Sequence, residues 1–308
     1  MEGLQVKPTG KYGPLWTAMV TPFHENGSID FKACESLIDH LIATGTDVLV
    51  VAGTTGESPF LTLEACEQLF RFCVKYVNGR VPIVAGTGTN STKTTVERSL
   101  MAEEAGVDAI MLVTPYYNKP SQDGLYAHFQ HVATKTSLPI MLYNVPGRTG
   151  CHLEAETVIR LSTIDSIVAI KEASGDLEQI AAIIEGTPDS FAVYSGDDGL
   201  TLPVLAIGGD GIVSVASHVL GQEMKQMVNA FLTGQKEDAA KAHRQLLPAM
   251  KAMFLAPNPS CVKYALNQLG VNVGNVQLPL IPLNELEKKQ VDYALASFAT
   301  MKNKAELN

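Results

Sequence analysis

The sequence has no apolar run that approaches the ~20 residues of a membrane-spanning helix. It also has no cluster of lysine and arginine longer than a pair, and its net charge is −9. A protein that binds nucleic acid needs a basic face, so this composition argues against a nucleic-acid partner as well as a membrane. The polar stretch from Met1 to Gly13 lacks the apolar core of a secretory signal, and we therefore expect a cytoplasmic protein.

Paired cysteines and paired histidines are missing too. The five cysteines contain no Cys-x-x-Cys spacing, which predicts reduced thiols rather than disulfides. Cys66 and Cys73 lie seven residues apart in a helical pattern, so we expect them to share a packed face. No His-x-His or His-Glu-x-x-His occurs, and His128 and His131 are interpreted as ordinary helix residues. We expect no metal site.

Short apolar runs recur every 20 to 34 residues, with helical patterns between them. The runs are continuous rather than alternating, as is typical of strands buried on both faces. Alternating strands and helices imply a parallel sheet, and eight units over about 220 residues predict a (β/α)8 TIM barrel. The eight predicted strands are Leu15–Val20, Val48–Val51, Pro82–Ala85, Ala109–Val113, Pro139–Tyr143, Ile167–Ile170, Phe191–Ser195 and Gly211–Val215.

No further strand of similar quality follows the eighth. We expect residues 1–232 to form a catalytic barrel and residues 233–308 to form a C-terminal helical extension packed on it, since no Ser/Gly-rich linker separates the two. Helices are predicted along the chain where apolar residues repeat on one face and glycine or a polar cap ends the pattern. They include Phe31–Ala43, Ser91–Ala105, Leu220–Leu232, Lys236–Phe254, Pro259–Leu269 and Leu283–Met301.

Active sites of such barrels lie at the C-terminal ends of the strands. Lys171 directly follows the apolar run of strand 6. Burial disfavours the ammonium form, and a neutral lysine amine attacks ketones to form a Schiff base. The structural alternative is a lysine that reaches solvent or pairs with Glu172, and residue types alone leave both interpretations open.

Other reactive types stand at neighbouring strand ends. Tyr143 is either a packed ring or a proton carrier beside Lys171. The turn Gly53–Gly56 is either a plain entry into a helix or a carboxylate site built from N–H groups and hydroxyls. Arg148 is either a surface charge or a clamp for a second carboxylate. The Gly86–Asn90 loop lacks the Gly-Lys-Ser/Thr ending of a phosphate loop, so we discard a phosphate role.

Together these segments resemble the dihydrodipicolinate synthase/N-acetylneuraminate lyase family of class I aldolase-type barrels. The resemblance covers nearly the whole chain, and its motifs are specific in combination rather than singly. It is carried by Gly53-Thr54-Thr55-Gly56-Glu57-Ser58, Tyr116-Tyr117-Asn118 and Tyr143-Asn144-Val145-Pro146-Gly147-Arg148-Thr149. Within the family these segments are similar to the members that condense pyruvate with L-aspartate-4-semialdehyde, giving 4-hydroxy-tetrahydrodipicolinate in the diaminopimelate and lysine pathway.

The resemblance implies four catalytic residues. Lys171 would form the imine with pyruvate, so that no diffusible cofactor is needed. Tyr143 would donate and accept protons, and Thr54 and Tyr117 would complete its proton relay. Tyr117 would reach into the site of a neighbouring subunit, which implies at least a dimer, and the family suggests a homotetramer built as a dimer of dimers.

The resemblance also implies substrate-binding residues. Thr55 would bind the pyruvate carboxylate through its hydroxyl and backbone N–H, and Arg148 would hold the carboxylate of aspartate semialdehyde. The backbone at Val213, where relatives more often have isoleucine, would face pyruvate. The Gly196 carbonyl would contact bound substrate.

Three alternatives compete with this interpretation. The nearest is another pyruvate-dependent aldolase of the same family, acting on sugar acids or keto acids, against which Arg148 and the double-threonine turn argue. A non-catalytic barrel and a metal-dependent hydrolase are the others.

Lysine-inhibited relatives also carry histidines and a glutamate where this sequence has Leu63, Cys66 and Thr94, so we expect weak or absent inhibition by lysine.

Overall fold

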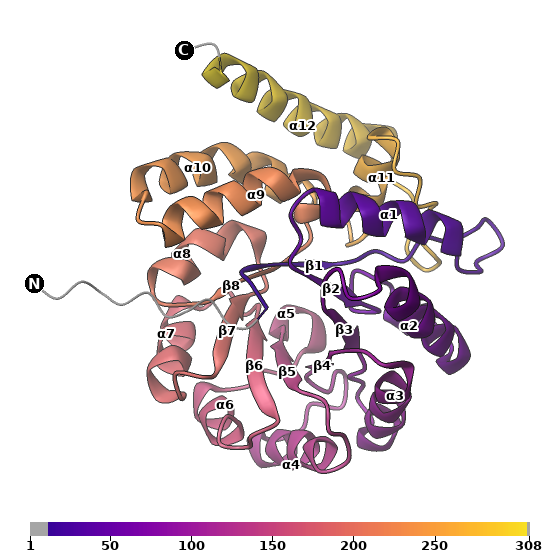
Figure 1. Ribbon diagram of the computed structural model, residues 1–308, viewed down its shortest axis with the longest axis vertical. Helices are drawn as coiled ribbons and strands as arrows, with labels where there is room; N and C mark the ends of the chain where they lie inside the picture. Colours follow the sequence, from indigo (N-terminus) through magenta and orange to yellow (C-terminus); the bar gives the residue numbers. More distant parts are fainter. Residues whose placement is uncertain (1–11, 307–308) are drawn as a thin grey trace, which may run out of the picture.

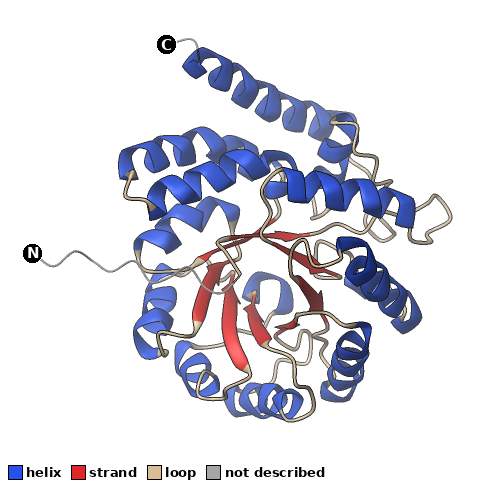
Figure 2. Cartoon of the chain, viewed as in Figure 1, coloured by secondary structure: helices blue, strands red, loops and turns tan. Residues whose placement is uncertain are grey.

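The computed structural model describes residues 12–306, with side chains up to residue 300, and contains a closed barrel of parallel strands. Each strand pairs with its sequence neighbours, and β1 closes the ring against β8 (Figure 2). The predicted TIM barrel is therefore confirmed. The eight strands are β1 (Leu15–Ala18), β2 (Val48–Val51), β3 (Ile83–Gly86), β4 (Ala109–Val113), β5 (Ile140–Asn144), β6 (Ile167–Glu172), β7 (Ala192–Ser195) and β8 (Gly211–Ser214).

Helices follow the strands and surround the barrel (Figure 2). Short polar side chains start several of them: Asp30 accepts a hydrogen bond from Ala33 N, and Ser91 accepts one from Thr94 N. The helices of the barrel are α1 (Phe31–Ala43), α2 (Leu63–Val77), α3 (Thr92–Ala105), α4 (Gln122–Ala133), α5 (Pro146–Thr149), α6 (Ala155–Leu161), α7 (Leu177–Gly186), α8 (Thr201–Ala206) and α9 (Ser217–Leu232), with 3-10 turns η1 (Ser58–Phe60) and η2 (Asp198–Leu200).

Alternate residues of each strand enter two different cores. Leu49, Ile110 and Ile170 belong to the large apolar layer between strands and helices. Trp16, Met141 and Val213 belong to a smaller cluster inside the barrel. Because both faces are buried, the strands are continuous apolar runs, which is the pattern on which their prediction rested.

Three helices follow the barrel, as the sequence predicts: α10 (Lys236–Ala252), α11 (Ser260–Gln268) and α12 (Glu285–Glu306). Helix α10 packs along α9, and α11 contacts both α9 and α12 (Figure 1). Helix α9 begins at Ser217 rather than at the predicted Leu220, whose φ of −128° marks a kink inside it. Helix α10 ends at Ala252, two residues before the predicted end.

Residues 1–11, on which the expectation about a secretory signal mainly depends, lie outside the described residues. Within residues 12–306, no helix is long and apolar enough to cross a membrane. The predicted shared face of Cys66 and Cys73 is confirmed, because both side chains are buried in α2. His128 and His131 are indeed helix residues of α4, and His128 Nδ1 forms a hydrogen bond of 2.8 Å with Thr92 Oγ1.

Candidate active site

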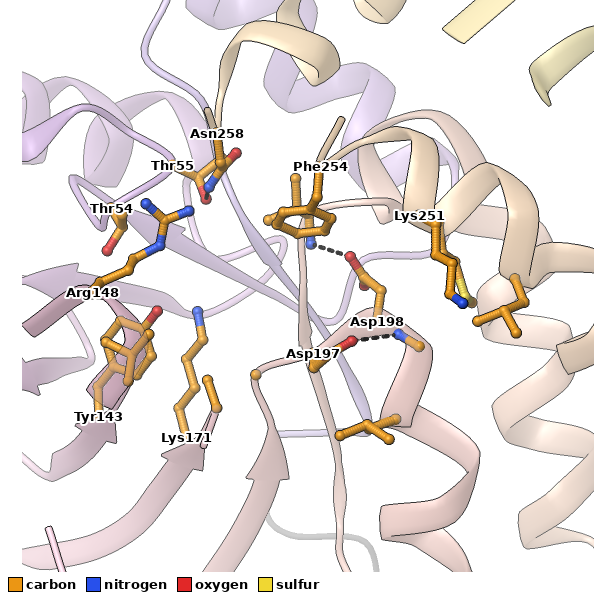
Figure 3. A pocket seen from close by; sticks show the side chains of 18 residues that line it. Thr54, Thr55, Tyr143, Arg148, Lys171, Asp197, Asp198, Lys251, Phe254 and Asn258 are labelled. Atoms are coloured by element: carbon orange, nitrogen blue, oxygen red, sulfur yellow. Dashed lines mark hydrogen bonds between the residues drawn. The ribbon is translucent and has the colours of Figure 1, made fainter. Parts of the chain in front are cut away.

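Lys171 and Tyr143 lie side by side at the C-terminal end of the barrel. They are paired in the register of β6 with β5, and the Lys171 Nζ is 4.3 Å from the centroid of the Tyr143 ring. Both side chains are 5% exposed. Figure 3 shows both side chains pointing into the cavity at the barrel mouth. Strand β6 continues two residues beyond its predicted end, so Lys171 is a strand residue. Because side chains alternate between the two faces of a strand, the Lys171 side chain points into the barrel.

The alternative that Lys171 pairs with Glu172 is wrong. Successive strand residues point to opposite faces, and Glu172 lies outside the barrel. There its carboxylate accepts hydrogen bonds from Asn144 Nδ2 at 2.9 Å, Gln179 Nε2 at 3.1 Å and the Ser174 N–H at 2.7 Å. Among the described residues, no carboxylate forms an ion pair with Lys171.

The cavity at the barrel mouth has a volume of about 540 Å³. Six of the eight residues predicted from the sequence line it. They are Thr54, Thr55, Tyr143, Arg148 and Lys171, which Figure 3 labels, and Gly196. They come from the ends of four different strands, so the strand-end rule brings together residues up to 142 positions apart, from Thr54 to Gly196.

Gly196 lies directly against the lysine. A Cβ at this position would be 3.1 Å from Lys171 Cε and 2.6 Å from the Ala173 Cβ. The glycine therefore leaves the space through which the lysine side chain extends. Packing also explains the glycine that begins the Gly86–Asn90 loop, since a Cβ at Gly86 would lie 2.4 Å from the Ala52 carbonyl oxygen.

Arg148 lies in the single turn of α5 after β5, and its guanidinium reaches over the cavity (Figure 3). It forms no ion pair with any described carboxylate. A guanidinium without a protein partner at a cavity rim is suited to bidentate binding of a carboxylate from solution.

Tyr117 and Val213 do not line the cavity. Tyr117 is 90% exposed and has a left-handed backbone, with φ of 73°. It borders a separate surface hollow, which it shares with Arg148. The Val213 side chain is buried inside the barrel, while Val215 lines the cavity. No hydrogen bond links the hydroxyls of Thr54, Tyr143 and Tyr117 within the described chain.

The segment after β7 contributes two aspartates, Asp197 with a local partner and Asp198 with partners in and directly after β8. The Asp198 carboxylate is buried, and it accepts hydrogen bonds from Ser214 Oγ at 2.5 Å and from the Ala216 N–H at 2.9 Å. Burial raises the pKa of Asp198, which the hydrogen bonds partly oppose. Asp197 Oδ1 accepts from the Gly199 N–H at 2.8 Å (Figure 3). Both residues line the cavity wall opposite Thr54.

Reasoning from strand ends missed the residues that the C-terminal helices contribute. Helix α10 and the segment after it supply Leu247, Met250, Lys251, Phe254 and Asn258 to the cavity. The sequence signal that was available is the segment Ala256-Pro257-Asn258-Pro259, which marks a turn but does not indicate where it lies.

The comparisons with known proteins agree over nearly the whole chain. The model of the dihydrodipicolinate synthetase family matches residues 11–297. This chain belongs to the dihydrodipicolinate synthetase family. Within that family, it is 60% identical to the 4-hydroxy-tetrahydrodipicolinate synthase of Bacillus velezensis over 90% of this chain and 96% of that protein. The synthase of Bacillus subtilis is 59% identical over 90% and 96% of the two chains.

Solved structures of dihydrodipicolinate synthetase family members have the same fold. The dihydrodipicolinate synthase of Bacillus anthracis superposes with a TM-score of 0.92 at 52% identity, covering 94% of this chain and 99% of that one. The 4-hydroxy-tetrahydrodipicolinate synthase of Methylacidiphilum fumariolicum superposes with a TM-score of 0.93 at 40% identity, over 96% and 99% of the two chains. These matches extend through the C-terminal helices as well as the barrel.

Proposed function

We propose that this chain is a lyase with the activity of a 4-hydroxy-tetrahydrodipicolinate synthase, condensing pyruvate with L-aspartate-4-semialdehyde in lysine biosynthesis. The family membership and the names of its relatives support the reaction. The observation that supports Lys171 as the reacting residue is its buried amine, which has no carboxylate partner among the described residues and lies against the Tyr143 ring.

The reaction begins with an imine. The neutral Lys171 amine adds to the ketone carbon of pyruvate, and the carbinolamine loses water to give the imine, with Tyr143 carrying the protons. The positively charged imine withdraws electrons, so the adjacent methyl group becomes acidic. Loss of one methyl proton gives an enamine, which is the carbon nucleophile of the condensation.

Carbon–carbon bond formation and ring closure follow. The enamine carbon attacks the aldehyde of aspartate semialdehyde, and the resulting alkoxide takes a proton to become a hydroxyl. The amine of the substrate then attacks the imine carbon and displaces Lys171, which closes the six-membered ring. Overall, one water molecule is released per product, and the lysine amine is regenerated without a diffusible cofactor.

The remaining residues bind and orient the two substrates. We assign Thr55 and the Gly196 carbonyl to pyruvate and its adducts, together with the backbone at Val213. Arg148 is assigned to the carboxylate of aspartate semialdehyde, and Thr54 and Tyr117 to proton transfer with Tyr143. The exposed Tyr117 supports the proposal that it acts in a neighbouring subunit, in a homotetramer built as a dimer of dimers.

We also propose that residues 1–232 form the catalytic barrel and that residues 233–308 form a C-terminal helical extension packed on it. A cytoplasmic setting is supported by the cysteines, all five of which are buried and unpaired. Burial raises the pKa of the Cys34 thiol to about 12, so this thiol stays protonated.

Reductive trapping tests the proposed chemistry. Incubation with pyruvate and borohydride, followed by peptide mass spectrometry, is expected to place a stable adduct on Lys171. An adduct elsewhere, or none, would overturn the Schiff-base assignment. Turnover is then compared between aspartate semialdehyde and longer sugar-acid aldehydes, and a preference for the latter would favour the rival aldolase activity.

A further inference from the structure

Asn258 connects the C-terminal helices to the carboxylate-binding turn of the barrel. It lies between α10 and α11, is 7% exposed and lines the active-site cavity. Its Nδ2 donates a hydrogen bond of 2.9 Å to Thr55 Oγ1, across 203 residues of sequence (Figure 3). Its Oδ1 is buried and has no hydrogen-bond partner among the described residues. The Thr55 contact is therefore the hydrogen bond that orients this amide.

The direction of that hydrogen bond determines what Thr55 can bind. A threonine hydroxyl has a single proton and can accept at its oxygen. Because Asn258 donates to Thr55 Oγ1, the hydroxyl proton remains available, and no described residue accepts it. The Thr55 side chain is 2% exposed and lines the cavity. It therefore presents a hydrogen-bond donor to the cavity, which is complementary to an anion.

Further contacts join the C-terminal segment to the same turn. Glu57, two residues after Thr55, forms an ion pair of 2.6 Å with Lys263 of α11, and both side chains are buried. Glu57 Oε2 also accepts the Gln277 N–H at 2.8 Å. The segment that carries Asn258 is thus held on both sides in sequence, before it by the packing of α10 on α9 and after it by the ion pair of Lys263 with Glu57 of the turn.

We infer that Asn258 is a positioning residue for pyruvate, which fixes the Thr55 hydroxyl as a donor to the pyruvate carboxylate. This inference rests on the proposed function, in which Thr55 binds that carboxylate. Asn258 acts through Thr55 and needs no contact with the reacting atoms. A carboxylate in its place would accept the Thr55 proton and leave the oxygen lone pairs of Thr55 facing the substrate anion.

Steady-state kinetics of Asn258→Ala and Asn258→Asp test the inference. For Asn258→Ala we expect the pyruvate KM to rise about tenfold, with kcat and the KM for aspartate semialdehyde changed less than about twofold. For Asn258→Asp we expect a rise of about a hundredfold, because reversal of the hydrogen bond is added to charge repulsion. At lower pH the aspartate is protonated and becomes a donor, so the pyruvate KM of Asn258→Asp relative to wild type is expected to fall.

A double-mutant cycle separates positioning from general structural damage. In a Thr55→Val background, Asn258→Ala is expected to change the pyruvate KM less than about twofold, since there is no hydroxyl left to orient. Asn267→Ala is the matched control, because Asn267 also joins α11 to the following segment, through Gly274 and Val273, but lies outside the cavity. It is expected to leave the pyruvate KM unchanged.

Three outcomes would overturn the inference: additive effects of Asn258→Ala and Thr55→Val, equal rises of both substrate KM values, or an unchanged pyruvate KM in both Asn258 variants. Borohydride trapping of the wild-type protein is run beside these assays. A missing wild-type adduct on Lys171 refutes the proposed function itself, whereas a normal wild-type adduct with unaffected Asn258 variants refutes the positioning role alone.

Discussion

Lys263 and Glu57 form an ion pair of 2.6 Å in which the side chains are only 2% and 0% exposed. The Lys263 ammonium also donates to the Asn275 carbonyl at 3.0 Å and lies 4.5 Å from the centre of the Phe23 ring. Burial lowers the pKa of Lys263, and the attraction of Glu57 opposes that shift. The pair joins helix α11 to the turn after β2.

Removing one partner of this pair is expected to destabilise the protein strongly. Lys263→Met leaves the Glu57 carboxylate buried without its cation, and we expect a loss of about 3–5 kcal/mol in the free energy of unfolding. The double variant Lys263→Met/Glu57→Gln removes both charges and should lose clearly less. Urea denaturation of both proteins is the measurement. Equal losses in the two variants would mean that the unpaired charge is not the cause.

The hydroxyl of Tyr143 is expected to be essential for turnover. Tyr143→Phe keeps the ring beside Lys171 but removes the proton carrier, so kcat should fall by about 10²–10⁴-fold. Tyr194→Phe is the matched control, since Tyr194 is also buried in the barrel but its hydroxyl donates to the Gly13 carbonyl, before the start of β1. We expect its kcat within about twofold of wild type. A Tyr143→Phe enzyme with normal kcat would contradict the proton-transfer role.

Tyr117 is expected to matter for catalysis although it lies outside the cavity of its own chain. Tyr117→Phe should lower kcat by about 10²-fold or more if its hydroxyl completes a relay in a neighbouring subunit. Mixed oligomers provide the stricter measurement. Combining inactive Tyr117→Phe and Lys171→Ala chains should restore activity, because some sites then receive both functional side chains. No recovery in an oligomer shown to contain both chains would refute the exchange.

Acid should destabilise the fold through buried histidines. His218 donates from Nδ1 to the Val215 carbonyl and accepts the Val20 N–H at Nε2, so both nitrogens are used by the neutral ring. Burial lowers its pKa from 6.5 to about 4. Between these values the unfolded chain binds a proton that the folded one does not, so stability falls as pH decreases. His218 alone should contribute a loss of about 2 kcal/mol between pH 7 and pH 5.

Denaturation of His218→Gln at several pH values checks this contribution, because glutamine offers a donor and an acceptor without titrating. We expect its unfolding free energy to depend less on pH than that of wild type by that amount. His128, whose pKa burial also lowers to about 4, should account for a similar share, and His128→Gln is the parallel variant. A wild-type pH dependence in His218→Gln would contradict the assignment.

Inhibition by lysine is expected to be weak or absent. The family resemblance implies that inhibited relatives carry imidazole and carboxylate groups at the positions that Leu63, Cys66 and Thr94 occupy here. Cys66 is buried in α2, and the Thr94 hydroxyl donates to Ser91 Oγ at the start of α3. Initial rates should remain unchanged in millimolar lysine. An inhibition constant in the micromolar range would contradict this expectation.

The barrel and its central pair could be predicted because their signals are local and repetitive. Each strand is a short apolar run, and Lys171 and Tyr143 each end such a run. Parallel strands in a closed ring bring those ends together, so topology alone places the two side chains at one mouth. The proximity of Lys171 Nζ to the Tyr143 ring, at 4.3 Å, follows from the register of β5 and β6.

The contribution of the C-terminal helices could not be predicted in the same way. Asn258 lies in an irregular segment, and its position depends on how α10 packs along α9. Sequence patterns would leave the charged Lys263 of α11 in solvent, yet it is 2% exposed and paired with Glu57. Because Glu57 is 206 residues away, no local pattern indicates this pairing. Contacts of this range have no local pattern in sequence.

The shared cavity wall has a consequence for recombination between relatives. A chimera joined at residue 232 would take Thr55 and Glu57 from one parent, and Asn258 and Lys263 from the other. Each parent would then supply half of a hydrogen bond and half of a buried ion pair. Crossover points that keep these two pairs within one parental segment should yield active hybrids more often than a junction at the end of the barrel. The segment from Thr55 to Lys263, rather than the barrel alone, is therefore the unit that should be exchanged intact.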